Sequence, residues 1–177
     1  YSSGVFTISG TPTQYGSFSY TVTTGGPCTN VSLSGTITVN ADATISLSSG
    51  SGTQTVCINT GIIPVAYTMG GSATNVSITA GSLPAGVTGS FSGGVFTISG
   101  TPTQSGTFNF TVTTVGPCAN PSVNGQITVN PTPVVNAISN TSYCNNSAGA
   151  AISFSTSTPG TATYNWTSTA DVGFGTN

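Results

Sequence analysis

Apolar and polar residues alternate along much of this chain of 177 residues. The clearest run is 108–113, in which Phe108, Phe110 and Val112 are separated by Asn and Thr residues. Because successive side chains point to opposite faces of a β-strand, a period of two predicts strands with one apolar face and one wet face. Similar runs occupy 63–69, 76–78, 96–98 and 127–129. No stretch of ten or more residues has the period of a helix.

Turn-forming residues separate these runs. Gly and Pro cluster at 70–71, 83–86, 93–94, 101–103 and 116–117, where their backbone preferences favour tight turns. The Gly pairs at 70–71 and 93–94 precede no helix and no Lys, so we interpret them as hairpin turns and not as phosphate-binding loops. The spacing predicts about seven short strands in about ninety residues, which is typical of an immunoglobulin-like β-sandwich. The expected fold class is therefore all-β, with tandem immunoglobulin-like sandwich domains.

A repeat with a period of 90 residues organises the chain. Residues 1–40 align without gaps on 91–130, and 28 of the 40 positions are identical. We therefore expect a complete repeat at 41–130, preceded at 1–40 by the C-terminal half of another. Residues 131–177 would form the N-terminal part of a divergent PKD-like or Ig-like repeat, because T-S-Y-C at 141–144 resembles T-Q-T-V-C at 53–57. Since the pattern is already under way at Tyr1, we expect an internal segment of a longer chain.

Charged residues are almost absent, which excludes several functions. The chain has no Lys, Arg or His, and its only acidic residues are Asp42 and Asp171. Without cations it cannot neutralise phosphates, so we expect neither nucleic acids nor anionic membrane surfaces as partners. No apolar run approaches the roughly 20 residues that span a bilayer, so no membrane insertion is expected. General acid–base catalysis lacks its usual groups, and metal binding lacks a ligand cluster. We predict no enzyme activity, no cofactor and no metal site.

Four cysteines, Cys28, Cys57, Cys118 and Cys144, occupy two kinds of position in the repeat. Cys28 is equivalent to Cys118, and Cys57 to Cys144. We predict a Cys57–Cys118 disulfide, because Cys118 falls in the turn between the last two strands and a first strand that starts at that pole would hold Cys57 nearby. Cys28 and Cys144 would then pair with residues outside this sequence. The alternatives are Cys28–Cys57 and Cys118–Cys144 bonds across the junctions, or free thiols. Disulfides would indicate an extracytoplasmic setting.

Two further sets of residues are weak candidates for carbohydrate sites. Six N-x-S/T sequons begin at Asn30, Asn75, Asn109, Asn140, Asn145 and Asn165. In a chain this rich in Asn, Ser and Thr such triplets arise by chance, so we do not expect glycans there. Tyr164 and Trp166 have rings that can stack on a sugar, but their alternation with Ala162 predicts core positions of the third repeat.

The segment 82–113 contains three recognisable sequence motifs. It contains L-P-A-G, I-S-G-T-P and G-T-F-N-F-T-V, and it resembles the Ig domains of bacterial surface proteins. T-Q-T-V-C at 53–57 with G-P-C at 116–118 is similar to repeats in giant secreted proteins of the Bacteroidetes. P-T-P-V-V-N, C-N-N-S and T-Y-N-W-T, at 131–136, 144–147 and 163–167, resemble the accompanying PKD-like repeats. The resemblance implies type IX secretion and adhesion, as in SprB-like gliding adhesins. Their O-glycosylation motif, Asp before Ser or Thr, is missing.

These features predict a structural repeat segment of a bacterial cell-surface adhesin or extracellular filament. Adhesion and gliding motility are the roles that the resemblance implies. The main partners would be neighbouring repeats of the same chain, with lateral self-association and surface glycans or proteins as further candidates. The alternative is a glycan- or protein-binding accessory module of a large secreted enzyme. Both hypotheses place the chain outside the cell.

Overall fold

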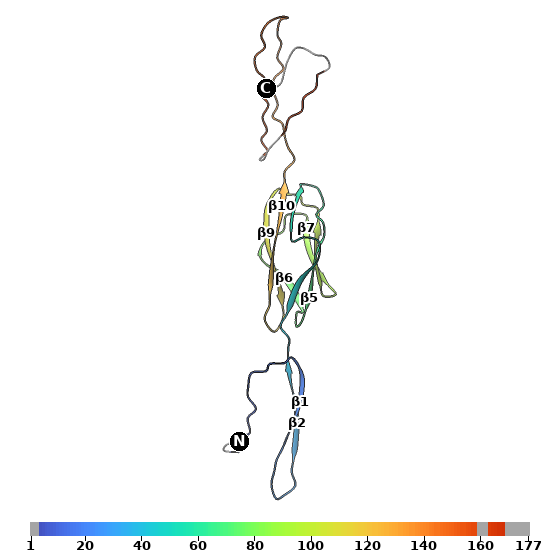
Figure 1. Cartoon of the computed structure of the whole chain (residues 1–177), viewed down its shortest axis with the longest axis vertical. Helices are drawn as coiled ribbons and strands as arrows, with labels where there is room; N and C mark the ends of the chain where they lie inside the picture. Colours follow the sequence, from blue (N-terminus) through green and yellow to red (C-terminus); the bar gives the residue numbers. More distant parts are fainter. Residues whose placement is uncertain (1–3, 159–162, 169–177) are drawn as a thin grey trace.

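The computed structural model describes residues 4–158 and 163–168. Within these residues it contains strands and no helix, so the all-β prediction is confirmed. Figure 1 shows an elongated molecule in which a hairpin, a central sandwich and a C-terminal segment follow one another along the long axis.

Two four-stranded sheets face each other in the central sandwich. One sheet has the order β3 (Thr44–Ser49), β5 (Val65–Gly70), β8 (Val95–Gly100) and β7 (Val87–Ser92). The other has the order β4 (Thr53–Cys57), β10 (Ser122–Asn130), β9 (Gly106–Val115) and β6 (Asn75–Gly81). All these strands lie within 41–130, the span predicted as one complete repeat. The repeat has eight strands, β3 to β10, whereas the sequence predicted about seven.

The first strand of the repeat runs from one pole of the sandwich to the other and changes sheets on the way. Near its start, the amide of Ala43 donates a 3.1 Å hydrogen bond to the carbonyl of Ala119 in the β9–β10 turn. The chain crosses between the sheets near Gly50, whose φ of 75° favours glycine. β4 then runs parallel to β10 and ends with Cys57 beside Asn130. The chain therefore reaches the far pole by Cys57.

Inward-facing side chains of both sheets form the core. Ile98 and Val112, one from each sheet, are fully buried, and Phe110, Ile127 and Val65 are at most 2% exposed. Removing one such side chain from water stabilises the fold by about 1.5–3 kcal/mol. The alternation predicted this face correctly for 76–78, 96–98, 108–112 and 127–129, where at least one residue of each run is buried.

The predicted run at 63–69 was wrong at its first residue. Ile63 was expected on the same apolar face as Val65, but its side chain is 69% exposed. The side-chain amide of Gln54 accepts a hydrogen bond from the Ile63 amide (2.9 Å) and donates one to the Ile63 carbonyl (2.7 Å). Pro64 follows and has no amide hydrogen to donate to a sheet. β5 therefore begins at Val65.

The hairpin of β1 (Gly16–Thr23) and β2 (Ser32–Val39) repeats the β9–β10 hairpin. Its first pair, Gly16 with Val39, and its last pair, Thr23 with Ser32, lie 90 positions before the corresponding pairs of β9 and β10. The counterparts of β3 to β7 would precede the hairpin in the repeat, and they are not part of the described residues. Its inner face is consequently open, and Leu33 is 77% exposed.

The described part of the C-terminal segment contains one isolated antiparallel bridge, between Val135 and Thr156. Next to it the amide of Asn136 donates to the carbonyl of Ser155 at 2.9 Å. The hydroxyl of Thr156 donates to the carbonyl of Val134 at 2.6 Å. This pairing is antiparallel, as is the pairing of β3 with β5 at the start of the central repeat.

Candidate functional site

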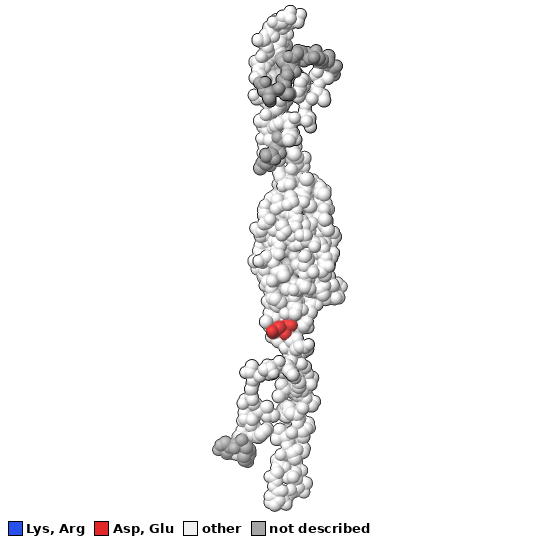
Figure 2. All heavy atoms as spheres, viewed as in Figure 1, with Lys and Arg blue, Asp and Glu red and all other residues white. Residues whose placement is uncertain are grey.

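The described residues offer little chemistry for catalysis. Asp42 is their single charged side chain, and Figure 2 shows it at the end of the sandwich that faces the hairpin. No three His, Cys, Asp or Glu side chains gather among the described residues to hold a metal ion. In the same part of the chain, no helix has the length and apolar character needed to cross a membrane. The absence of enzyme activity and of a cofactor stays a prediction.

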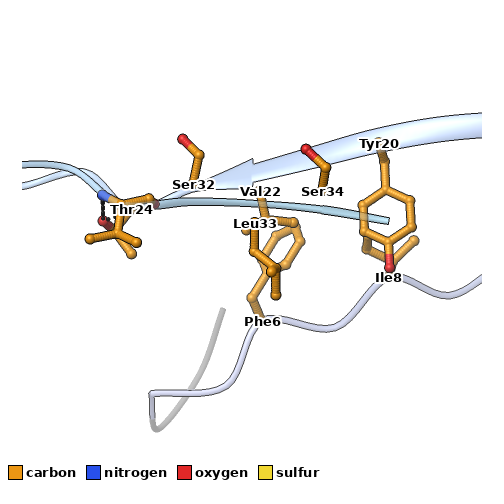
Figure 3. A pocket seen from close by; sticks show the side chains of 9 residues that line it. Phe6, Ile8, Tyr20, Val22, Thr24, Ser32, Leu33 and Ser34 are labelled. Atoms are coloured by element: carbon orange, nitrogen blue, oxygen red, sulfur yellow. Dashed lines mark hydrogen bonds between the residues drawn. The ribbon is translucent and has the colours of Figure 1, made fainter. Parts of the chain in front are cut away.

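An apolar groove of about 540 Å³ runs along the β1–β2 hairpin (Figure 3). Its lining comprises Phe6, Ile8, Tyr20, Val22, Thr24, Val31, Ser32, Leu33 and Ser34. Figure 3 shows Phe6 and Ile8, from the segment before β1, next to Leu33, Val22 and Tyr20 of the hairpin. Apolar concavities of this size are common ligand sites, so the groove must be compared with the complete repeat.

That comparison identifies the groove as an unfilled core. Counterparts of five lining residues lie 90 positions further on, and all of them are buried in the sandwich: Phe96, Ile98, Phe110, Val112 and Thr114. In the complete repeat these side chains meet between the two sheets. In the hairpin the strands that would cover them are missing from the described residues. We therefore do not interpret the groove as a ligand site.

The junction between the hairpin and the sandwich is short and held by two turns. Only residues 40–43 separate the end of β2 from the start of β3. Ala43 is 4% exposed, and its amide is bonded to Ala119 in the β9–β10 turn. A Cβ at Gly71, in the β5–β6 turn, would overlap the carbonyl of Asp42. The base of the sandwich therefore packs against the linker, which makes the junction the candidate functional site.

The predicted pair Cys57 and Cys118 is not brought together, and all four cysteines are free thiols. Cys57 lies beside Asn130, whereas Cys118 lies in the β9–β10 turn with its Sγ 3.6 Å from the carbonyl oxygen of Asn40. The nine residues of β10 run from one pole to the other, and the eight steps between them span roughly 26 Å at about 3.3 Å per step. A disulfide needs Cα atoms within about 7 Å. The prediction failed because the chain does not stay at the first pole but crosses to the other sheet and continues in the same direction.

The alternative pairings are not brought together either. Cys28 lies in the β1–β2 turn, so most of the hairpin and the whole sandwich separate it from Cys57. Cys144 follows the junction at residue 131, at the pole opposite Cys118. Three of the thiols are exposed and Cys118 is partly exposed.

The weak carbohydrate candidates gain no support. Tyr164 and Trp166 are 47% and 51% exposed, so the structure does not place them in a core as predicted. Ala162 and Asp171 lie outside the described residues. At the sequon of Asn109, the side-chain oxygen accepts a 2.8 Å hydrogen bond from the side-chain amide of Gln126.

Comparisons with known proteins do not assign a family. No protein-family model matches the chain, and no curated protein matches it. Two solved structures of an endo-fucoidan hydrolase, MfFcnA4, from glycoside hydrolase family 107 are distantly similar, one of them a substituted variant. Their TM-scores are 0.37 and 0.36 at 18% and 19% identity. Each match covers 67% of this chain and 19% of the hydrolase chain, so the chain spans about a fifth of that protein.

Sequence reasoning placed a repeat boundary between residues 40 and 41 but missed the contacts that hold the linker, because these contacts involve no recognisable functional group. Ala43, Gly71 and Ala119 act through a backbone hydrogen bond and close backbone packing. The one available signal was the repeat itself, which ends both aligned copies with the same residue type at Asn40 and Asn130.

Proposed function

We propose that this chain is a segment of a stiff extracellular stalk or filament, built from end-to-end β-sandwich repeats in a cell-surface adhesin. The observation that carries the proposal is the held junction. Flexible linkers are typically exposed and rich in Gly and Ser. Residues 40–43 read N-A-D-A, and the last of them is buried against the next sandwich.

The path of the chain through the sandwich supports the same proposal. The linker after β2 enters at the pole of the β9–β10 turn, and β10 leaves at the opposite pole. Successive repeats therefore extend in one direction, as Figure 1 shows for the three segments of this chain. Arrays of this kind are quasi-one-dimensional, with each repeat contacting mainly its neighbours.

The immunoglobulin-like class and the role in adhesion and gliding are finer parts of the proposal. They are supported by the resemblance of 82–113 and by two sheets folded from one repeat of about 90 residues. The neutral surface suits an exposed fibre, because the chain has no Lys or Arg and hence no trypsin site. Hydroxyl and amide groups on the outer face bond to one another, as Thr111 does to the Asn124 side chain at 2.8 Å.

The test uses a tandem chain, in which residues 1–130 are followed by 41–177 so that the complete repeat occurs twice. Small-angle scattering and negative-stain images should show two collinear sandwiches with a narrow distribution of the angle between them. Inserting Gly-Ser-Gly-Ser between Asn130 of the first copy and Ala41 of the second should broaden that distribution, because it adds flexible residues between the end of the first sandwich and the linker that is held at Ala43.

The matched control places the same four residues between Gly93 and Gly94 of one copy. This β7–β8 turn has open space around Gly93, so the angle distribution should not change. If the parent tandem chain has as broad an angle distribution as the variant with the insertion at the junction, the stalk proposal fails.

A further inference from the structure

We propose that a disulfide bond joins successive repeats across each junction, from Cys118 of one repeat to the counterpart of Cys57 in the repeat before it. The inference rests on the end-to-end array proposed above. Neither pairing is complete within this sequence. The counterpart of Cys57 in the preceding repeat falls ahead of Tyr1, and that of Cys118 in the following repeat falls beyond Asn177.

Two equivalent asparagines bring the two kinds of cysteine to one place. Asn40 ends the preceding repeat as Asn130 ends the central one. Cys57 is the Cα partner of Asn130 in the β4–β10 pair, and the next amide, of Ile58, donates to the Asn130 carbonyl at 2.8 Å. Cys118 reaches the equivalent carbonyl, that of Asn40, with its Sγ at 3.6 Å. Asn40 is the counterpart of Asn130 in the preceding repeat. The counterpart of Cys57 in that repeat should therefore lie beside Asn40, the residue that Cys118 contacts.

These two contacts bring both kinds of cysteine next to the same residue of the repeat. Paired strands lie about 4.8 Å apart, so the Cα of the Cys57 counterpart lies about that far from Asn40. The sulfur of Cys118 already touches the same residue, and a disulfide requires Cα atoms about 4.4–6.8 Å apart. A carbonyl oxygen has two lone pairs, so Asn40 can accept from the counterpart of Ile58 and lie next to the sulfur of Cys118 at once.

The exposure of the cysteines points the same way. Cysteine is among the residues most often buried in proteins, yet Cys57 is exposed and Cys118 is partly exposed. They lie at opposite poles of one repeat, where a bond inside the repeat is out of reach. Opposite poles are the arrangement that links each repeat to both of its neighbours. Successive repeats would then be joined by a disulfide bond as well as by the polypeptide chain. Two covalent connections restrict bending at the junction more than one does.

The bond forms by thiol–disulfide exchange with a small oxidised disulfide such as glutathione disulfide. One cysteine thiolate attacks this oxidant and displaces one glutathione thiolate, leaving a mixed disulfide. The second cysteine thiolate attacks the protein sulfur and displaces the other glutathione. The two protein thiols lose two electrons and two protons in total, and the oxidant is reduced to two thiols.

The test oxidises the tandem chain at low concentration with glutathione disulfide and isolates the monomer by size exclusion. Thiol titration should find two fewer free thiols than in the reduced protein. Mass spectrometry after a chymotrypsin digest should find a Cys57 peptide linked to a Cys118 peptide.

Matched variants decide which copies are joined. Cys57→Ser in the first copy, or Cys118→Ser in the second, should abolish the link. Cys57→Ser in the second copy, or Cys118→Ser in the first, should leave it intact. A link that disappears in the second pair of variants, or survives in the first pair, would overturn the inference.

Scattering of the same samples separates this inference from the proposed function. Collinear sandwiches with all thiols still free would remove the disulfide and leave the stalk. Freely bending sandwiches without the link would remove both. A collinear pair whose angle distribution narrows on oxidation, and only in variants that keep the link, is the expected result.

Discussion

The two hairpins of this chain have nearly the same sequence and lie in opposite environments. β1–β2 and β9–β10 share their register, and 28 of 40 positions around them are identical. Yet Ile127 is 1% exposed and Ile37, its counterpart, is 44% exposed. Phe110 is 2% exposed and Tyr20, its counterpart, 39%.

The difference separates what local sequence does from what burial does. Alternation and the Gly-Pro turn suffice for the hairpin pairing, including its outward hydroxyl contacts, such as Thr21 to Ser34 at 2.7 Å. The core needs the second sheet, which only the complete repeat supplies. A two-stranded hairpin alone is at best marginally stable in water, so stability in this chain should reside in 41–130.

Completing the half repeat should have the largest effect on this contrast. A copy of 41–90 placed ahead of residue 1 supplies the missing strands and should add a second cooperative unfolding transition of roughly 5 kcal/mol or more. Hydrogen exchange of amides 16–39 in urea measures it. The control copy carries Val65→Asp and Tyr67→Asp, which put charges into the new core. Equal protection with both copies would contradict the contrast.

Truncating the same isoleucine in each hairpin comes next. Ile127→Ala should destabilise the central repeat by about 2–5 kcal/mol, because the buried side chain leaves a cavity. Ile37→Ala removes a half-exposed side chain, so the free energy of unfolding that the urea transition of the chain gives should change by less than about 0.5 kcal/mol. Similar losses for the two variants would show that the hairpin also stabilises the fold.

The cross-strand glycines sharpen the comparison sterically. A Cβ at Gly125 would overlap the ring of Phe110, and one at Gly35 would lie 2.5 Å from the hydroxyl of Tyr20. Phe110 is enclosed in the core, so Gly125→Val should cost about 1–3 kcal/mol by overpacking. Tyr20 can turn into solvent, so Gly35→Val should cost little. Thermal denaturation of both variants measures the difference, and a harmless Gly125→Val would disprove the packing account.

Tyr67, in the sheet that the hairpin lacks, gives the smallest and pH-dependent effect. Burial raises the pKa of Tyr67 above its ordinary value of 10.0, and its hydroxyl has no hydrogen-bond partner among the described residues. The folded state favours the neutral phenol. The contribution of neutral Tyr67 to the free energy of unfolding is therefore fully present below about pH 10, and it falls as the pH rises through the raised pKa. Tyr67→Phe should add about 1 kcal/mol and reduce the alkaline loss. Urea midpoints at about pH 8 and 11 test this, and identical pH dependence in parent and variant would contradict it.

Much of the fold could be predicted from the alternation of apolar and polar residues and from the turn-forming Gly and Pro residues. The Gly93-Gly94 pair forms the β7–β8 turn with φ of 57° and 77°, as the sequence indicated. Ile63 could not be predicted, because its exposure depends on the side chain of Gln54 holding its backbone from another strand.

The candidate site was predicted less well than the fold. The positions of Cys57 and Cys118 in the repeat were found correctly, but the pole of Cys57 was not. Direction along a strand cannot be seen in an alternating pattern, because the pattern is the same whichever way the chain runs. The parallel pairing of β4 with β10 decides it, and these strands are far apart in sequence.

The sequence by itself determined most of the strands and of their inward faces, the repeat and the scarcity of charge, since each follows from the order and type of nearby residues. The tertiary structure decided where the first strand changes sheets, which poles the cysteines occupy and how the linker is held. These depend on contacts between distant segments, such as Ala43 with Ala119, whose partners become neighbours only when the two sheets close on a shared core.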